Sequence, residues 1–145
     1  MAERDDTREI EALVATFFAA FTSGAGADQR LEALRAAFLP HARIIRTCGL
    51  PAESYDLDSF IEPRRRLLTD GTLTGFREAP TDGRIDVFGD IGHWFGRYEK
   101  SGLMNGAAYG GSGMKSIQCV RTAHGWRISA VAWDDDPADQ SAQSV

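Results

Sequence analysis

Arg64 is the polar residue with the most clearly defined chemical possibilities in this 145-residue sequence. It shares helical spacing with Phe60, so its side chain is predicted to lie along the apolar face of a helix. A guanidinium in that position needs a negatively charged partner, because an unpaired buried charge costs several kcal/mol. Asp134, Glu78 and an anionic ligand are three candidate partners, and the sequence leaves the choice open. Arg46 is a second cation that can contact the same anionic ligand.

A run of three aspartates follows the strand-like segment GWRISAVAW, residues 125–133. Side chains alternate between the two faces of a strand, so Asp134 is predicted to face the interior unless a bulge shifts the register. Asp134 is therefore a candidate for acid–base catalysis and a candidate partner of Arg64. Asp135 and Asp136 are predicted to end the strand in water. Because neighbouring aspartates point to opposite faces, the run does not predict a metal site.

His41 is the other candidate for general acid–base catalysis, because imidazole titrates near neutral pH. It follows Pro40 at a predicted helix–strand corner, where a solvent-exposed histidine is the alternative interpretation. Neither Cys48 nor Cys119 has a partner at a spacing that indicates a nucleophile or a metal site. The glycine-rich segment 106–116 does not match a phosphate-binding loop, since it leads into a strand instead of a helix. The sequence therefore predicts no metal and no cofactor.

Three helices are predicted in the first half of the chain. Apolar residues repeat at helical spacing over residues 10–21 and again over 31–38, and a third helix is predicted over 58–69. Asp6 with Glu9 has the spacing of a capping box at the start of the first helix. From residue 72 onward the sequence is typical of antiparallel strands separated by turns. Helices followed by strands predict an α+β fold, with the helices on one face of a curved sheet.

Both faces of the predicted sheet carry large apolar groups. Trp94 and Tyr98 are expected on the inner face, where they either line a pocket or simply fill the core. The residues predicted to line a ligand pocket are Phe17, Arg46, Phe60, Arg64, Trp94, Tyr98, Gln118 and Asp134. The outer face needs a second cover, and another copy of the chain is the simplest one. The residues predicted to form this homodimer face are Phe95, Ile117, Val131 and Trp133.

Composition excludes several classes of partner. The formal net charge of −5 argues against binding to nucleic acid or to an anionic membrane, both of which need clustered Lys and Arg. The segment MAERDDTREI has no apolar signal region, and no stretch approaches the roughly 20 apolar residues of a membrane span. We therefore expect a cytoplasmic protein with a single domain over residues 1–136 and a disordered tail over 137–145.

Three motifs resemble the nuclear-transport-factor-2-like superfamily, which includes ketosteroid isomerase and the SnoaL-like polyketide cyclases. They are FFAAFTSG at the end of the first helix, LRAAFLPHARII between the second helix and a strand, and GWRISAVAW in the last strand. The resemblance covers residues 6–136 and implies a cone-shaped α+β barrel. In such a barrel, three N-terminal helices pack on the concave face of a strongly curved, mostly antiparallel sheet. It also implies a pocket inside the cone and dimerisation through the other face.

The resemblance does not extend to the catalytic groups of the isomerase. Its general base would fall at Arg46, its tyrosine at Phe17 and its protonated aspartic acid near Gln118, and none of the three matches. His41 stands where the superfamily commonly has an aspartate after the second helix. We therefore expect a dimeric protein that binds a small, partly apolar ligand, with an anion as one candidate. Lyase, isomerase or hydrolase chemistry is left open, and the alternative is a non-catalytic interaction module with a packed pocket.

Overall fold

The computed structural model describes residues 2–49 and 51–137. Except for Pro137, the predicted tail over residues 137–145 lies outside this range. The described elements are α1 (Ala2–Ala19), α2 (Ala27–Ala37), β1 (Phe38–Arg46), β2 (Glu53–Tyr55), α3 (Leu57–Thr69), β3 (Leu73–Phe88), β4 (Ile91–Met104), β5 (Ala107–Thr122) and β6 (Gly125–Asp135). The sequence predicted all of these elements except the short strand β2.

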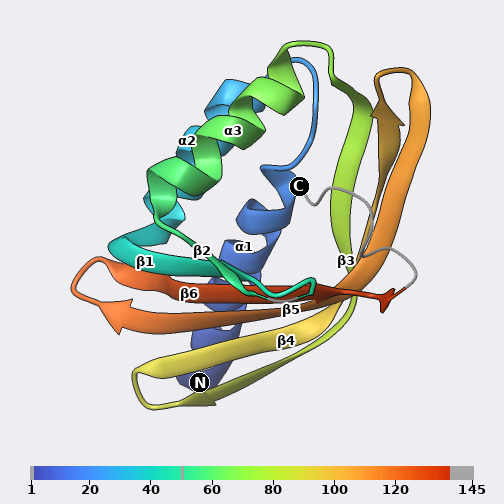
Figure 1. Cartoon of the computed structure of the whole chain (residues 1–145). Helices are drawn as coiled ribbons and strands as arrows, with labels where there is room; N and C mark the ends of the chain where they lie inside the picture. The colour runs from blue at the N-terminus through green and yellow to red at the C-terminus, as the bar shows by residue number, and fades with distance from the viewer. Residues whose placement is uncertain (1, 50, 138–145) are drawn as a thin grey trace.

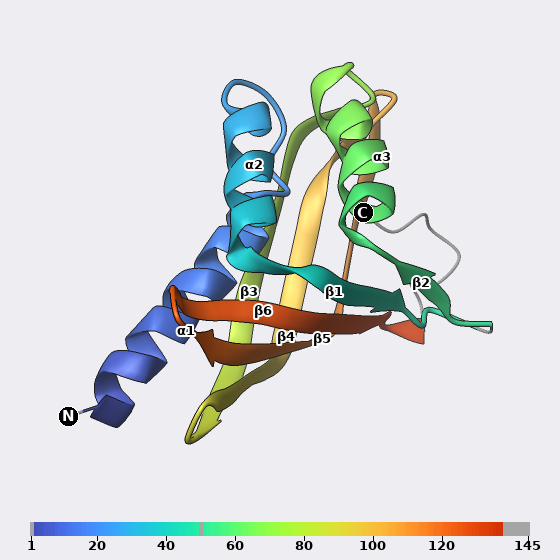
Figure 2. The same ribbon diagram turned by 90° about the vertical axis from the view of Figure 1, so that its left-hand side faces the viewer.

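The strands form one sheet in the order β2-β1-β6-β5-β4-β3. Only the β1–β6 pair is parallel among the described strands, and every other neighbouring pair is antiparallel. The long strands β3, β4 and β5 bend, so that the sheet curves around the helices (Figure 1). The view in Figure 2 shows all three helices on the concave side of this sheet. The predicted α+β architecture is therefore confirmed.

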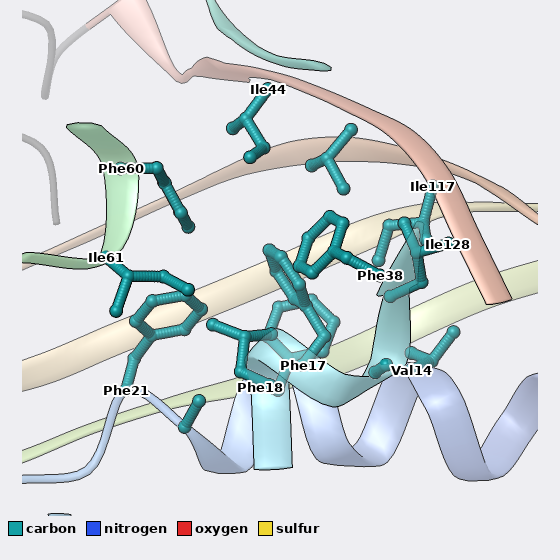
Figure 3. Close-up of a cluster of buried hydrophobic side chains, with 14 of the residues drawn as sticks. Val14, Phe17, Phe18, Phe21, Phe38, Ile44, Phe60, Ile61, Ile117 and Ile128 are labelled. Atoms are coloured by element: carbon teal, nitrogen blue, oxygen red, sulfur yellow. The ribbon is translucent and has the colours of Figure 1, made fainter. Parts of the chain in front are cut away.

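Helix α1 buries its aromatic stripe against the sheet, as its 3.6-residue periodicity predicts. Val14, Phe17 and Phe18 of α1, and Phe21 just after its end, point into a cluster shared with α3 and the strands (Figure 3). Phe17 packs edge-to-face on Phe18 with ring centroids 5.4 Å apart. This geometry stabilises an aromatic pair in addition to the effect of burying the two rings. This cluster holds the helical layer on the concave face.

The predicted capping box at the start of α1 is wrong. The helix begins at Ala2, so Asp6 lies inside it, and its carboxylate joins α1 to the last two strands instead. Asp6 accepts hydrogen bonds from Arg121 Nη1 at 2.9 Å, Arg121 Nη2 at 2.8 Å and Trp126 Nε1 at 3.1 Å. The hydrogen bonds from Arg121, and then from Trp126, lower the pKa of the Asp6 carboxyl. The Asp6 carboxylate makes tertiary contacts with distant residues, and the spacing of residues within one helix does not reveal such contacts.

Arg64 lies on the buried face of helix α3, as its helical spacing with Phe60 predicts. Asp56 caps its N-terminus by accepting from the Ser59 backbone N–H at 2.8 Å, while the Ser59 hydroxyl accepts from the Asp56 N–H. Arg64 is buried, whereas its neighbour Arg65 turns outward and pairs with Asp28 at 2.7 Å. The helical period therefore separates one buried cation from its exposed neighbours.

A β-bulge reverses the predicted faces of β6. Gln118 of β5 is opposite Ala130, but the next residue, Cys119, is opposite Ile128, so Ser129 is inserted without a partner. One extra residue moves every following side chain to the other face of the strand. Val131, Trp133 and Asp135 are consequently buried, and Asp134 is exposed. The predictions that Asp134 faces inward and that Val131 and Trp133 cover an outer dimer face are therefore wrong.

Ile117 is also buried in the core and does not belong to an outer face. It is opposite Trp94 on the neighbouring strand, and residues directly opposite in a sheet share a face. Ile117 is one of the buried core side chains labelled in Figure 3. Of the four residues predicted for the dimer face, only Phe95 is exposed.

Candidate functional site

Five charged side chains lie buried on the concave face of the sheet, and we call them the buried charge cluster. Each residue has an exposed fraction between 2% and 6%, although charged side chains are rarely buried without a reason. The cluster consists of Arg64 on α3, Glu78 on β3, Lys100 on β4, Lys115 on β5 and Asp135 on β6. Cross-strand register gathers them, since Glu78 is opposite Lys100 in the sheet.

Asp135 forms one arm of the cluster. Its Oδ1 accepts a hydrogen bond from the Tyr98 hydroxyl, and its Oδ2 lies 3.7 Å from Lys100 Nζ. Burial, followed by the bond to Asp135, raises the pKa of Tyr98, so the phenol stays protonated. Gly113 makes room for this arm, because a Cβ there would lie 2.4 Å from the Asp134 carbonyl oxygen and 3.1 Å from the Tyr98 ring. A glycine of the segment 106–116 thus serves close packing in a strand.

Lys115 and Glu78 form the second arm, with Nζ of the lysine 3.8 Å from Oε2 of the glutamate. The ammonium also lies 4.0 Å from the centroid of the Tyr98 ring and 4.7 Å from that of Trp133. Burial lowers the pKa of Lys115 to about 8, with Glu78 opposing the shift. Burial likewise raises the pKa of Glu78. Both shifts favour the neutral forms, so this pair is prone to exchange a proton.

Arg64 forms the third arm. Its Nη1 donates to the Phe60 carbonyl oxygen at 3.0 Å, and its guanidinium lies 4.0 Å from the centroid of the Phe60 ring. Burial lowers the pKa of Arg64 to about 10. The predicted partner Asp134 is exposed on the other face of β6. Glu78 favours the charged guanidinium electrostatically, but its ion pair is with Lys115.

Several buried polar atoms of this region have no hydrogen-bond partner among the described residues. They are Glu78 Oε1, Glu78 Oε2, Arg64 Nε and Tyr109 Oη. Tyr109 lies next to the cluster, with Lys100 Nζ 5.7 Å from its ring centroid. Buried polar groups in folded proteins are normally paired, so a set of unpaired ones indicates a place for a polar ligand or water. Together these atoms offer carboxylate acceptors, a guanidinium donor and a phenol.

The structure separates the other sequence-predicted site residues into four groups. Phe17, Phe60, Trp94 and Tyr98 are buried, and all of them except Trp94 contact residues of the cluster. Arg46 lies near the surface, where its Nη1 is 3.1 Å from Glu53 Oε1. Gln118 is exposed, because it follows Ile117 and so faces the convex side. His41 is exposed in a separate groove of about 600 Å³ between α2, β1 and α3, which leaves it outside the buried charge cluster.

Sequence reasoning missed Lys100, Lys115 and Asp135, and named Glu78 only as one alternative. The rarity of lysine relative to arginine is a feature of the sequence that could have drawn attention to the two lysines. The chain contains two lysines against fourteen arginines, and both lysines lie in strands of the predicted sheet. Asp135 carried no comparable signal, since its burial depends on the bulge at Ser129.

The described residues contain no metal-binding group and no membrane-spanning helix. No three side chains among His, Cys, Asp and Glu gather there in an arrangement that could hold a metal ion. Within the same ranges, no helix has the length and apolar character needed to cross a membrane. The chemistry available in the cluster is therefore that of amines, carboxylates, a guanidinium and phenols.

Sequence comparison finds no matching family model and no matching curated protein. Solved structures match over almost the whole chain. A protein from Kribbella flavida has a TM-score of 0.76 at 17% identity and covers 97% of this chain and 99% of its own. A nuclear transport factor 2-like superfamily protein from Salmonella enterica has a TM-score of 0.75 at 15% identity, over 99% of this chain and 96% of its own.

A third similar structure is an NTF2-like protein with a cystatin-like fold from Novosphingobium aromaticivorans. Its TM-score is 0.70 at 17% identity, and the match covers 99% of this chain and 92% of that one. At these identities the likeness concerns the backbone and not the site residues. The chain therefore has the fold of the nuclear-transport-factor-2-like superfamily.

Proposed function

We propose that the buried charge cluster binds a small, partly apolar organic anion and transfers protons to and from it. The observation that carries this proposal is the set of unpaired buried atoms on Arg64, Glu78 and Tyr109. Leaving such groups unsatisfied costs about 1–3 kcal/mol each, and a polar ligand that bonds to them offsets this cost. Arg64 is the expected anchor, because its free Nε and planar guanidinium suit a carboxylate.

The charge balance of the cluster supports an anionic ligand. Arg64, Lys100 and Lys115 carry positive charge when ionised, against two carboxylates on Glu78 and Asp135. A bound anion supplies counter-charge for this excess positive charge in a site that is shielded from water, where the attraction between opposite charges is strong. The rings of Phe60 and Trp133 beside Arg64 offer the apolar surface that small-molecule sites commonly use.

The Lys115–Glu78 pair supports acid–base chemistry. A lysine with a pKa lowered to about 8 can accept and return a proton near neutral pH. The raised pKa of Glu78 makes its carboxyl a proton donor over a wider pH range than an exposed glutamate. Pairs of groups whose environments bring their pKa values together are typical of sites that move protons.

Thermal unfolding with a panel of aromatic and aliphatic carboxylates tests the ligand. At about 100 times its Kd, a bound compound adds about 2.7 kcal/mol, which raises the Tm by several degrees. We expect at least one carboxylate to raise the Tm of the wild type and to lose this effect in Arg64→Met. Arg66→Met removes an exposed arginine from the same helix and is the matched control. If Arg64→Met retains the full shift, the anion does not bind at Arg64.

We propose, in addition, a homodimer through the convex face of the sheet. Support comes from Phe88, Ile91 and Phe95, whose exposed fractions are 83%, 53% and 47%. Exposed aromatic and aliphatic side chains that lie together are a common feature of protein interfaces. A groove of about 390 Å³ adjoins them, lined in part by His93 and Gln118. In the alternative function, this dimer is a non-catalytic interaction module and the cone is packed.

Sedimentation velocity at micromolar concentration tests the dimer. We expect the wild type to sediment as a dimer and Phe95→Glu as a monomer, because a buried unpaired carboxylate opposes association. Leu103→Glu is the matched control, since Leu103 is exposed at the far end of the same strand. A monomeric wild type overturns the dimer. If the wild type is a dimer but no carboxylate in the thermal panel raises its Tm, the non-catalytic alternative is favoured.

A further inference from the structure

We infer that Lys115 is an amine nucleophile that forms an imine with a ligand carrying both a carbonyl group and a carboxylate, an oxo acid. The inference rests on the proposed function and deepens it, because it names the substrate class of the same site. It stands on the position of Lys115 between aromatic rings, on its ion pair with Glu78 and on the nearby guanidinium of Arg64.

The distribution of lysine in the chain is the first argument. Both lysines, Lys100 and Lys115, are buried on the concave face, and the other fourteen basic residues are arginines. Arginine binds anions at least as well as lysine, but its guanidinium does not lose a proton in proteins. An amine is the only one of these groups that can become neutral and attack a carbon atom. The cone therefore contains the two side chains of the sequence capable of this reaction.

The surroundings of Lys115 are the second argument. Its ammonium lies 4.0 Å from the centroid of the Tyr98 ring, 4.7 Å from that of Trp133 and 5.7 Å from that of Phe17. These rings replace water around the amine, and burial lowers its pKa to about 8. A desolvated lysine of this kind has a usable neutral fraction near neutral pH, which is the requirement for imine formation.

The ion pair supplies the nucleophile and the acid of the covalent step, and the ligand supplies the carbonyl group. A proton passes from the Lys115 ammonium to the Glu78 carboxylate and leaves a neutral amine beside a neutral acid. The amine nitrogen attacks the carbonyl carbon, a C–N bond forms, and the proton lost by nitrogen ends on the former carbonyl oxygen. Glu78 then protonates that hydroxyl, the C–O bond breaks and water leaves. The products are a protonated imine, an ionised Glu78 and one water molecule, so charge and atoms balance.

The position of Arg64 selects an oxo acid from among carbonyl compounds. The guanidinium of Arg64 lies 5.7 Å from the centroid of the Trp133 ring, and Lys115 Nζ lies 4.7 Å from the same centroid. The two cations therefore lie beside the same indole, which places an anchor for a carboxylate and an amine in one part of the cluster. The carboxylate of an oxo acid can accept hydrogen bonds from Arg64 while its carbonyl carbon meets Lys115.

Reductive trapping on the full chain tests the imine. Phenylglyoxylate, an oxo acid, and benzaldehyde, which lacks the carboxylate, are each incubated with the protein and sodium cyanoborohydride, and peptide mapping locates the adduct. We expect labelling at Lys115 to exceed that at Lys100 about tenfold with phenylglyoxylate, because Lys115 lies between aromatic rings beside Glu78, whereas Lys100 is held in the ion pair with Asp135. In guanidinium chloride the preference between the two lysines should disappear.

Variants separate the roles of the groups. Lys115→Arg keeps the cation and should lose the adduct, whereas Arg66→Met removes an exposed cation outside the cluster and is the control that should keep it. Arg64→Met should reduce labelling by phenylglyoxylate and leave labelling by benzaldehyde unchanged. Native wild-type protein labelled only at Lys100 or at the N-terminal amine, or at no amine, overturns the inference. If carboxylates raise the Tm while Lys115 stays unlabelled, the imine is wrong and the proposed function stands; if both fail, so does the proposed function.

Discussion

Replacing Asp135 with asparagine is expected to destabilise the folded protein by about 3–5 kcal/mol. The reason is that Asp135 Oδ2 lies 3.7 Å from Lys100 Nζ and Oδ1 accepts from the Tyr98 hydroxyl, both inside the core. Without the carboxylate, the buried ammonium of Lys100 loses the negative charge that lies 3.7 Å from it, and weakening the compensation of a buried charge is costly. Urea-induced unfolding, followed by tryptophan fluorescence, measures the change in free energy.

Asp134→Asn is the control for this prediction, because Asp134 is the adjacent aspartate and is exposed. We expect it to change stability by no more than about 0.5 kcal/mol. The bulge at Ser129 determines which of the two aspartates is buried. Equal losses of stability in the two variants would therefore contradict the bulge. In the double variant Asp135→Leu with Lys100→Met, much of the lost stability should return, since well-packed apolar groups replace a buried ion pair with little cost.

Replacing Trp133 with alanine is expected to cost about 3–5 kcal/mol, as large-to-small substitutions of buried aromatic residues do. Trp133 is buried, with its ring centroid 5.9 Å from that of Phe60 and 4.7 Å from Lys115 Nζ. The substitution leaves a cavity and also removes the aromatic ring that contacts the cations of Arg64 and Lys115. Urea unfolding again measures the loss.

The control places Trp133→Ala in the Phe95→Glu background, where the proposed dimer is absent. The loss should be as large there as in the wild type, because Trp133 packs against helix α3 of its own chain. If Trp133 instead acted through a subunit interface, its substitution would cost little in that background. Such a result would favour the outward orientation that simple strand alternation predicts.

Local sequence patterns were sufficient for the helices and for the fold class. The spacing of Val14 and Phe17 identifies the buried face of α1, and the position of Arg64 on α3 follows from the same helical period. These inferences succeed because a helix is built from contacts between residues close in sequence. The order of helices followed by strands likewise predicted the α+β fold.

The orientation of β6 depended on contacts that no single strand contains. Ser129 is inserted because of the way β6 pairs with β5, and this insertion buries Trp133 and Asp135 while it exposes Asp134. Ile117 was assigned to the wrong face for a related reason, since only its pairing with Trp94 shows which side it shares. Register is a property of two strands together, and a sequence read along one strand does not contain it.

The sequence by itself determined the helical faces, the order of the elements and the buried position of Arg64. Tertiary structure decided which charges accompany it, because Glu78, Lys100, Lys115 and Asp135 come from four strands and meet only through the register and curvature of the sheet. Alternation along each strand is a local rule, but one inserted residue reverses it, and only the paired strand shows where the insertion lies.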